Sequence, residues 1–146
     1  MKLAWLLWLA SALPQPVADR TCLAATIYLE AQSQSALGQL AVAEVAQRRR
    51  TTGRWGKSLC DVVEARDQFA LSTTSKSYIF DNIDSWKTAW EVSGASIAMW
   101  WLPEQWRVAV VPKADHFLLA SSMIPSWVHG APLATIGEHN FYHVID

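Results

Sequence analysis

Two successive stretches near the start of the chain favour long helices. Residues 21–32 contain no glycine or proline, and Asp19 or Thr21 can cap their first turn. Residues 35–49 carry apolar side chains at helical spacing and end in arginines, whose charge suits the C-terminal end of a helix dipole. We therefore expect the first half of the chain to be helical.

The faces of these two helices follow from a rotation of about 100° per residue. The residues predicted to share a mostly apolar face of the first helix are Leu23, Thr26, Ile27 and Glu30. Those predicted to point inward from the second helix are Leu37, Leu40, Ala41 and Val45. Glu44 and Arg48 have the spacing of an ion pair, which we expect on the outer face.

Shorter elements are expected in the rest of the chain. Residues 55–65 indicate a short helix or turn, residues 66–83 are polar and irregular, and residues 86–99 have helical spacing despite Gly94. The predicted strands are 107–111, 117–120 and a pair within 134–144 that turns near Gly137. Because 146 residues suffice for one domain, we predict an α+β fold that is mainly helical, with a small β part toward the C-terminus.

The N-terminal residues have the pattern of an export signal. Lys2 precedes an uncharged run, residues 3–13, of the length usual for the apolar core of a signal peptide. Small residues suited to cleavage are Ala12 and Ala18. We expect residues 1–18 to be a signal peptide or an N-terminal hydrophobic segment. The alternative is a short helix that packs on the domain or anchors it transiently at the inner membrane, since a permanent span needs about 20 apolar residues.

The interpretation of the two cysteines depends on this predicted export. An exported chain reaches the periplasm, the cell wall or the extracellular space, where the conditions are oxidising. We therefore expect Cys22 and Cys60 to form a disulfide, and the alternative is a pair of buried thiols.

Charge and aromatic content limit the classes of partner. A formal net charge of -1, with a single dense basic run at residues 48–50, argues against nucleic acid. The nine tryptophans favour a large aromatic core. The alternative for a few of them is a groove in which flat rings stack on the C–H faces of sugars.

Glu30 is the sharpest candidate for chemistry. A glutamate on a helix is usually solvated, but Glu30 falls on a mostly apolar face. Burial disfavours the ionised form and raises the pKa of a carboxyl, so that it can hold a proton at neutral pH and donate it to a leaving oxygen. Cleavage of a glycosidic bond requires an acid of this kind.

Short motifs follow one another in a recognisable order over residues 21–144. They are residues 22–31 with Tyr28-Leu29-Glu30-Ala31, and then residues 38–45, 55–63, 68–69, 115–117, Trp127 and 136–142. Together they resemble the SleB-type cell wall hydrolases, a family of spore-cortex-lytic enzymes and related wall hydrolases.

The resemblance implies a lysozyme-like catalytic domain over residues 19–146, whose first helix presents Glu30 as the catalytic acid. It also implies cleavage of the peptidoglycan glycan strand at N-acetylmuramic acid, often as a lytic transglycosylase that needs one carboxyl. The residues it implies as substrate contacts are Tyr28, Gln68, Phe69, His116, Trp127, His139 and Tyr142. We expect a monomer that acts on peptidoglycan without a metal or another cofactor.

The chain departs from the family pattern at three places. Leu29 stands where the family often has glycine, residues 32–34 lack the second acid of the family motif, and residues 70–71 are Ala-Leu instead of Ser-Trp. A hydrolytic mechanism would need a second carboxylate, about 5 to 5.5 Å away for retention or about 6.5 to 9.5 Å away for inversion. The available acids are Asp61, Glu64, Asp67 and Asp115.

Two other functions compete with the glycosidase. One is a zinc-dependent amidase that acts on the peptide stem, with ligands drawn from His116, His129, His139 and His143. The other is a non-catalytic wall-binding protein with a tryptophan-rich cleft. A phage endolysin for cell lysis and a bacterial wall-remodelling enzyme both suit an exported chain of this size.

Overall fold

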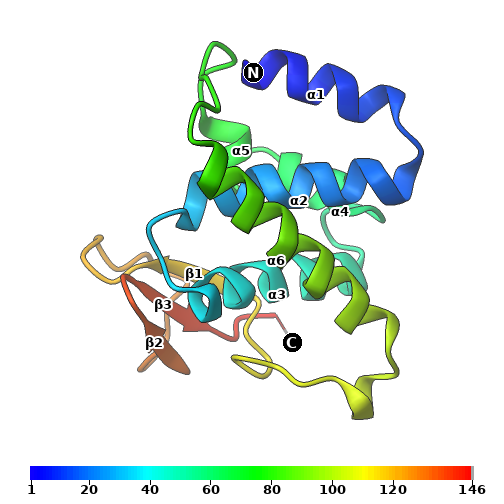
Figure 1. Ribbon diagram of the computed structural model, residues 1–146. Coiled ribbons are helices and arrows are strands. Elements are labelled where there is room, and N and C mark those ends of the chain that lie inside the picture. Colours follow the sequence, from blue (N-terminus) through cyan, green and yellow to red (C-terminus); the bar gives the residue numbers. More distant parts are fainter. Residues whose placement is uncertain (146) are drawn as a thin grey trace.

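The computed structural model describes residues 1–145. Its helices are α1 (Leu3–Ala12), α2 (Gln15–Ala31), α3 (Ala36–Thr52), α4 (Leu59–Glu64), α5 (Ala70–Thr73), α6 (Ile83–Trp101) and the 3-10 helix η1 (Glu104–Trp106). Its strands are β1 (His116–Leu119), β2 (Ala134–Ile136) and β3 (His139–Tyr142). The sheet lies beside α3, at the opposite end of the molecule from α1 (Figure 1). This mainly helical architecture with a small sheet confirms the predicted α+β class.

Helix α2 is the central element, because it contacts each of α1, α3, α4, α5 and α6. All side chains of residues 21–28 are buried, so burial is not confined to the predicted apolar face. A helix surrounded by protein is apolar on every side, and its alanines let the neighbouring helices approach. It begins at Gln15, earlier than predicted, and Pro16 is tolerated there because the N–H groups of a first turn lack helical partners.

Helix α3 confirms the helix predicted over residues 35–49. Its start is capped by Ser35, whose hydroxyl accepts the Gly38 N–H at 3.2 Å. Its end is Gly53, which adopts the left-handed conformation with a φ of 70°.

The buried face of α3 differs from the prediction in two places. Leu37, predicted to point inward, is 59% exposed. Glu44, predicted to lie outside, is buried, although it does pair with Arg48 at 3.3 Å. Periodicity alone mistook a buried, hydrogen-bonded carboxylate for a surface charge.

Residues 107–111, predicted as a strand, have no regular secondary structure. The N–H groups of Val110 and Val111 donate to the Glu44 carboxylate at 2.6 and 3.1 Å. A helix side chain therefore takes the donors that a neighbouring strand would have used.

Helix α6 extends the helix predicted over residues 86–99 at both ends, starting after its cap at Asn82. Gly94 is explained by packing: a Cβ there would lie 2.6 Å from Nη2 of Arg20. That guanidinium donates to the Trp90 carbonyl from Nε and Nη2, at 3.1 and 2.9 Å. The glycine lets a cation from α2 cross the middle of α6.

The three-stranded sheet is antiparallel in the order β1-β3-β2. Phe141 of β3 faces Phe117 of β1 on one side and Ala134 of β2 on the other. Gly137 has a φ of 57° at the turn from β2 to β3. These strands confirm the predictions for residues 117–120 and 134–144.

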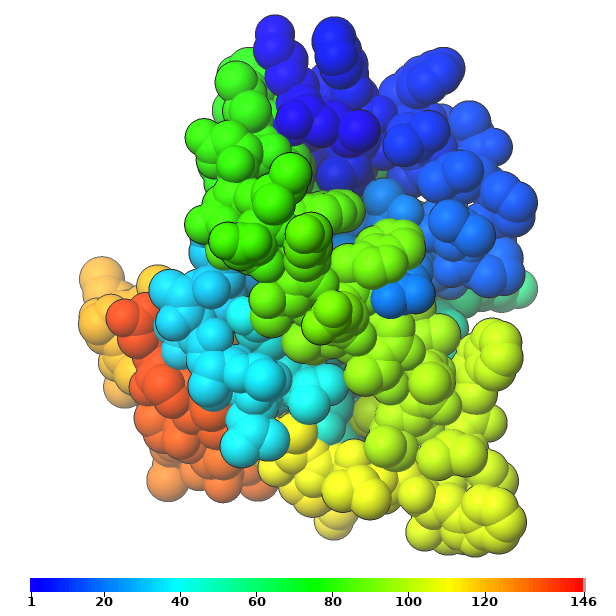
Figure 2. Space-filling model, viewed as in Figure 1, coloured from blue at the N-terminus to red at the C-terminus, as the bar shows by residue number. Residues whose placement is uncertain are grey.

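Helix α1 packs on α2 and beside residues 76–80. Leu3 and Leu6 are buried, whereas Trp5 and Trp8 are 66% and 71% exposed, and side chains of α1 stand out from the surface in Figure 2. The arrangement matches the alternative of a short hydrophobic helix on the domain, and removal of residues 1–18 as a signal peptide stays a prediction. Within residues 1–145, no helix has the length and apolarity needed to span a bilayer.

Helix α4 falls within the helix or turn predicted over residues 55–65. It starts with a capping box, in which Ser58 accepts the Asp61 N–H and the Asp61 carboxylate accepts the Ser58 N–H. Cys22 of α2 and Cys60 of α4 form a disulfide, as predicted. The bond ties the short helix to the central one.

Candidate active site

Glu30 lies in the last turn of α2 and is partly buried. Its Oε1 accepts the N–H of Ala70, the first residue of α5, at 2.6 Å. Phe69, the N-cap residue of α5, makes no side-chain cap, so the Glu30 carboxyl serves that end of the helix. Burial raises the pKa of Glu30, and the Ala70 N–H and the charge of Arg49 oppose this only in part.

Arg49 is a buried cation beside Glu30. It donates from Nε to the Asp115 carbonyl at 2.8 Å and from Nη1 to Oε1 of Gln68 at 3.2 Å. Burial lowers the pKa of Arg49 to about 10, although the charges of Asp115 and Glu30 act against this. Arg49 therefore stays charged at neutral pH.

Aromatic rings surround the Arg49 guanidinium, which lies 4.6 Å from the ring centre of Trp55 and 4.9 Å from that of Phe69. Phe69 also packs on Phe117 at 5.9 Å, and Phe117 meets His139 at 5.2 Å between centres. This chain of rings connects α5, next to Glu30, with the sheet.

A second row of rings continues from Trp55. Its ring lies 6.0 Å from that of His116, which lies 4.9 Å from Trp127, and Trp127 meets Tyr142 edge-on at 5.8 Å. Six of the predicted substrate contacts therefore join one network with Arg49. They are Gln68, Phe69, His116, Trp127, His139 and Tyr142.

Exposure divides these six residues into two groups. Gln68 is exposed, and His116 and Trp127 are half-buried, so they present surface to a ligand. The buried members, which support that surface from below, are Phe69, His139 and Tyr142.

Tyr28 lies apart from this network and is buried. Its ring packs against Phe80 at 4.9 Å and Trp86 at 6.4 Å, and its hydroxyl accepts the Asn82 N–H at 3.1 Å. This position argues against a direct contact between Tyr28 and a ligand. The tyrosine instead fixes the start of α6 on α2.

Asp115 joins the sheet to the helices. Burial would raise the pKa of its carboxyl, but hydrogen bonds from His116 and from the N–H groups of Val144 and Ile145 outweigh it and lower that pKa. Burial lowers the pKa of His116, while the bond to Asp115 acts in the opposite direction. Burial likewise lowers the pKa of His139, so its imidazole is neutral at neutral pH.

Comparison with known proteins decides the family. Residues 33–142 match the family model described as cell wall hydrolase. The chain belongs to the cell wall hydrolase family. Its fold also matches the catalytic domain of the germination-specific lytic transglycosylase SleB from Bacillus anthracis, with a TM-score of 0.65 and 22% identity over 85% of this chain and 93% of that domain. None of the curated proteins matches the chain.

The SleB-type resemblance is thereby confirmed, and this hydrolase is an enzyme of the cell wall. Glu30 lies just before the matched residues 33–142. Its assignment as the acid therefore depends on its position at the end of α2 and on its surroundings.

Of the four acids considered as partners of Glu30, Asp61 and Asp115 accept backbone N–H groups in the hydrolase, and Asp67 and Glu64 are exposed. Asp61 caps α4, Asp67 is exposed beside Arg66, and the Asp115 carboxylate accepts the bonds described above. Glu64 lies on α4 with an exposed side chain, and partial burial of its carboxyl raises the pKa.

Two of the four histidines of the hydrolase meet at the Asp115 carboxylate, but among the described residues no three metal-ligating groups that include a histidine come together as zinc ligands would. Nδ1 of His116 and Nδ1 of His143 lie 2.8 and 2.9 Å from the Asp115 carboxylate, His139 is buried among rings, and His129 is exposed. Among residues 1–145, three metal-ligating groups come close only at Cys22, Cys60 and Glu64, where the sulfurs are bonded to each other.

Arg49 is the site residue that sequence reasoning missed. The run at residues 48–50 was explained by the helix dipole, which treats its members alike. Helical phase does not distinguish them either, because residues 41–47 are all buried, and each of the three arginines therefore follows buried residues by four and by seven positions. Arg49 is set apart by the Asp115 carbonyl and Gln68, which lie outside α3 and leave no signal in the sequence around it.

Proposed function

We propose that this cell wall hydrolase cuts the peptidoglycan glycan strand at N-acetylmuramic acid, with Glu30 as the catalytic acid. The observation that carries the proposal is a partly buried carboxyl, Glu30, which accepts the Ala70 N–H next to an aromatic network with accessible members. Burial raises its pKa. A protonated carboxyl at neutral pH is what a glycosidic leaving oxygen needs.

The reaction runs in two proton transfers. Glu30 donates its proton to the glycosidic oxygen as the bond from that oxygen to the anomeric carbon breaks. The Glu30 carboxylate then takes the proton of the muramic C6 hydroxyl, and the C6 oxygen bonds to the anomeric carbon. A 1,6-anhydro end and a free hydroxyl on the leaving sugar result, and Glu30 regains its starting state.

Transglycosylation is favoured over hydrolysis because the intramolecular hydroxyl replaces a carboxylate nucleophile. Asp61 and Asp115, two of the acids that hydrolysis would recruit, already accept backbone N–H groups. Arg49 and the Ala70 N–H have a role that suits a single acid, since both stabilise the Glu30 carboxylate formed after the first transfer.

The aromatic network supplies the substrate surface in this proposal. Gln68, His116 and Trp127 contact the sugars, because they are accessible. Phe69, His139 and Tyr142 hold them in place from the buried side.

The decisive variant is Glu30→Gln, which keeps the shape and removes the proton. We expect cleavage of purified cell walls to fall at least about a hundredfold, measured as loss of turbidity. Glu64→Gln is the matched control, because burial raises the pKa of Glu64 too but it lies outside the aromatic network. Retained activity in Glu30→Gln would overturn the assignment.

Mass spectrometry of the released fragments separates the chemistries. Transglycosylation gives anhydro ends, and a hydrolytic muramidase gives reducing ends. A zinc amidase would give new amino ends, with activity abolished by a chelator. A non-catalytic wall-binding protein would sediment with peptidoglycan and release nothing.

We propose further that the enzyme is exported through its N-terminal segment and acts as a monomer on the wall. Its substrate lies outside the inner membrane, and the disulfide between Cys22 and Cys60 suits an oxidising compartment. Phage lysis and bacterial wall remodelling are both served by such an enzyme.

A further inference from the structure

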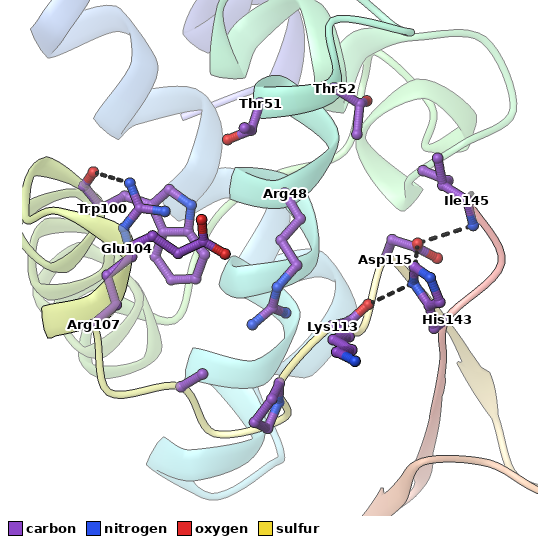
Figure 3. Close-up of a pocket in the computed structure, with 12 residues that line it drawn as sticks. Arg48, Thr51, Thr52, Trp100, Glu104, Arg107, Lys113, Asp115, His143 and Ile145 are labelled. Carbon is purple, nitrogen blue, oxygen red and sulfur yellow. Dashed lines mark hydrogen bonds and ion pairs between the residues drawn. The ribbon is translucent and has the colours of Figure 1, made fainter.

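A pocket of about 590 Å³ lies between α3, η1 and the segment that leads into β1. Figure 3 shows Arg48 inside it, between Glu104 on one side and Lys113 on the other. Glu30 is not among the residues that line this pocket. Arg48 lines the pocket, whereas the next residue, Arg49, interacts with Glu30. Helix α3 therefore contributes a cation both to the pocket and to the surroundings of Glu30.

Three cations line the pocket: Arg48, Arg107 and Lys113. Arg48 uses Nη1 on the Ala114 carbonyl and Nη2 on Glu44, and Arg107 uses Nε and Nη2 on the end of α6. Within residues 1–145, the Lys113 ammonium makes no ion pair or hydrogen bond with the protein, and the two arginines keep N–H groups without a partner.

The two arginines are held in place by one ring. Both guanidinium groups lie over Trp100, at 5.4 Å for Arg48 and 5.0 Å for Arg107. Trp100 is itself buried. The cations therefore sit on a rigid base, which reduces the entropy that a ligand must remove.

The two acids that line the pocket, Glu104 and Asp115, differ in whether their carboxylates are already occupied. The Asp115 carboxylate is occupied by His116, His143 and the backbone N–H groups of the C-terminal segment. Glu104 is exposed, and its carboxylate has no ion pair or hydrogen bond within the described part of the chain. Among the described residues, the pocket thus offers the ammonium of Lys113, the remaining N–H groups of Arg107 and of Arg48, which is paired with Glu44, and one acid without a partner. This pattern suits a ligand with more carboxylates than amines.

We propose that this pocket binds the peptide stem carried by muramic acid, an inference that rests on the proposed cleavage of peptidoglycan. Arg48, Arg107 and Lys113 bind the stem carboxylates, and Glu104 binds the free side-chain amine of the stem. The glycan meets Glu30 beside Arg49, and a stem of the same wall fragment reaches the pocket beside Arg48, the preceding residue of α3.

Binding is tested with a free stem tetrapeptide that carries carboxylates and one side-chain amine, titrated into the full chain by calorimetry. Lys113→Gln is expected to weaken binding about threefold, and the double change with Glu104→Gln about tenfold, as for accessible ion pairs. Lys87→Gln and Glu91→Gln are the matched controls, because both residues are exposed on α6 outside the pocket. No binding to the unaltered protein, or equal losses in the controls, would overturn the proposal.

A second measurement separates this proposal from the proposed function. Cleavage of glycan strands with stems is compared with cleavage of strands whose stems an amidase has removed. The pocket proposal expects Lys113→Gln to lower the ratio of the two rates, and an unchanged ratio contradicts it. If neither strand is cut by the unaltered enzyme, the glycosidase fails, while the tetrapeptide titration still decides on the pocket.

Discussion

Arg49 and Glu30 form the central electrostatic relation of the site. The arginine opposes the effect of burial on the Glu30 pKa, yet burial prevails and the pKa stays raised. The guanidinium is itself held by the Asp115 carbonyl, Gln68 and two aromatic rings. The raised pKa favours the protonated form of Glu30, and the guanidinium of Arg49 stands beside the carboxylate when it ionises.

The pH profile of Arg49 variants tests this relation. An acid catalyst must be protonated, so kcat/KM should fall as pH rises through the Glu30 pKa. Loss of the cation in Arg49→Gln removes an influence that lowers this pKa, so the alkaline limb should move to higher pH. Arg49→Lys keeps the charge and should leave the limb near its original place. A limb that is identical in all three proteins would contradict the role of Arg49.

Single residues were predicted from the sequence when one face of a helix carried the signal. Glu30 became a candidate because the helical face on which it falls is mostly apolar, and because the family motif contains it; its catalytic role stays a prediction. Glu44 and Arg49 were missed because charged residues are usually assigned to the surface, while both are buried against partners distant in sequence. No sequence pattern near Glu44 or Arg49 indicates a distant partner such as Val110 or Asp115.

The start of α2 bears on where the N-terminal segment is cut. Cleavage after Ala12 leaves α2 whole, whereas cleavage after Ala18 removes its first turn. Gln15 donates to Asp19 at 2.7 Å, and Asp19 accepts the Cys60 N–H at 3.1 Å. Cleavage after Ala18 would remove Gln15 and its hydrogen bond to Asp19. That bond holds the carboxylate that accepts the Cys60 N–H, next to the disulfide.

Cleavage after Ala12 is therefore the expected processing event. The mature N-terminus of the secreted protein, determined by mass spectrometry, should be Leu13. A mature chain that begins at Asp19 would contradict this. Secretion should also cease when Ala10 and Ala12 are both changed to large residues, and changing Ala18 alone should leave it intact.

The disulfide between α2 and α4 is expected to stabilise the fold strongly. It spans 38 residues of chain, for which the loop-entropy model gives about 4 kcal/mol. The variant with Cys22→Ala and Cys60→Ala should melt on the order of 10 °C lower in a calorimetric scan. Reducing agent should lower the melting temperature of the unaltered protein and leave the variant unaffected. Equal melting temperatures would show that the bond adds little.

The long helices and the hairpin were predictable, because their periodicity, caps and turn glycine are local signals. The predicted strand over residues 107–111 was wrong because its apolar pattern could not reveal that Glu44 takes its N–H groups. The relation of the aromatic rows to Arg49 was likewise beyond sequence reasoning, since it brings together α3, α5 and β1.

At the scale of the molecule, Asp115 connects the helical and β parts. Its carboxylate holds the segment after β3 through Val144 and Ile145, and its carbonyl accepts from Arg49. The link is charged and buried, so it should make the whole fold sensitive to acid.

The direction of this pH dependence of stability follows from the lowered pKa of Asp115 in the folded protein. Above its unfolded value of 3.8 the stabilisation is complete, and it is lost as pH falls through the lower folded value. Asp115→Asn should lower the free energy of unfolding at pH 7 by about 1 to 3 kcal/mol and flatten its dependence on pH in the acid range. Urea titrations at several pH values measure both. An equally steep acid loss in the variant would assign the effect to other carboxyls.

The contact between Glu30 and the first N–H of α5 has a practical consequence. A carboxylate is a stronger acceptor than a carboxylic acid, so the amide proton of Ala70 should change its magnetic resonance frequency as Glu30 titrates. That one signal reads the protonation state of the acid without substrate, product or label. Glu30→Gln keeps an oxygen for this amide, so it should abolish the pH dependence of the signal and leave α5 in place. The Ala70 amide is therefore a built-in probe of the Glu30 carboxyl.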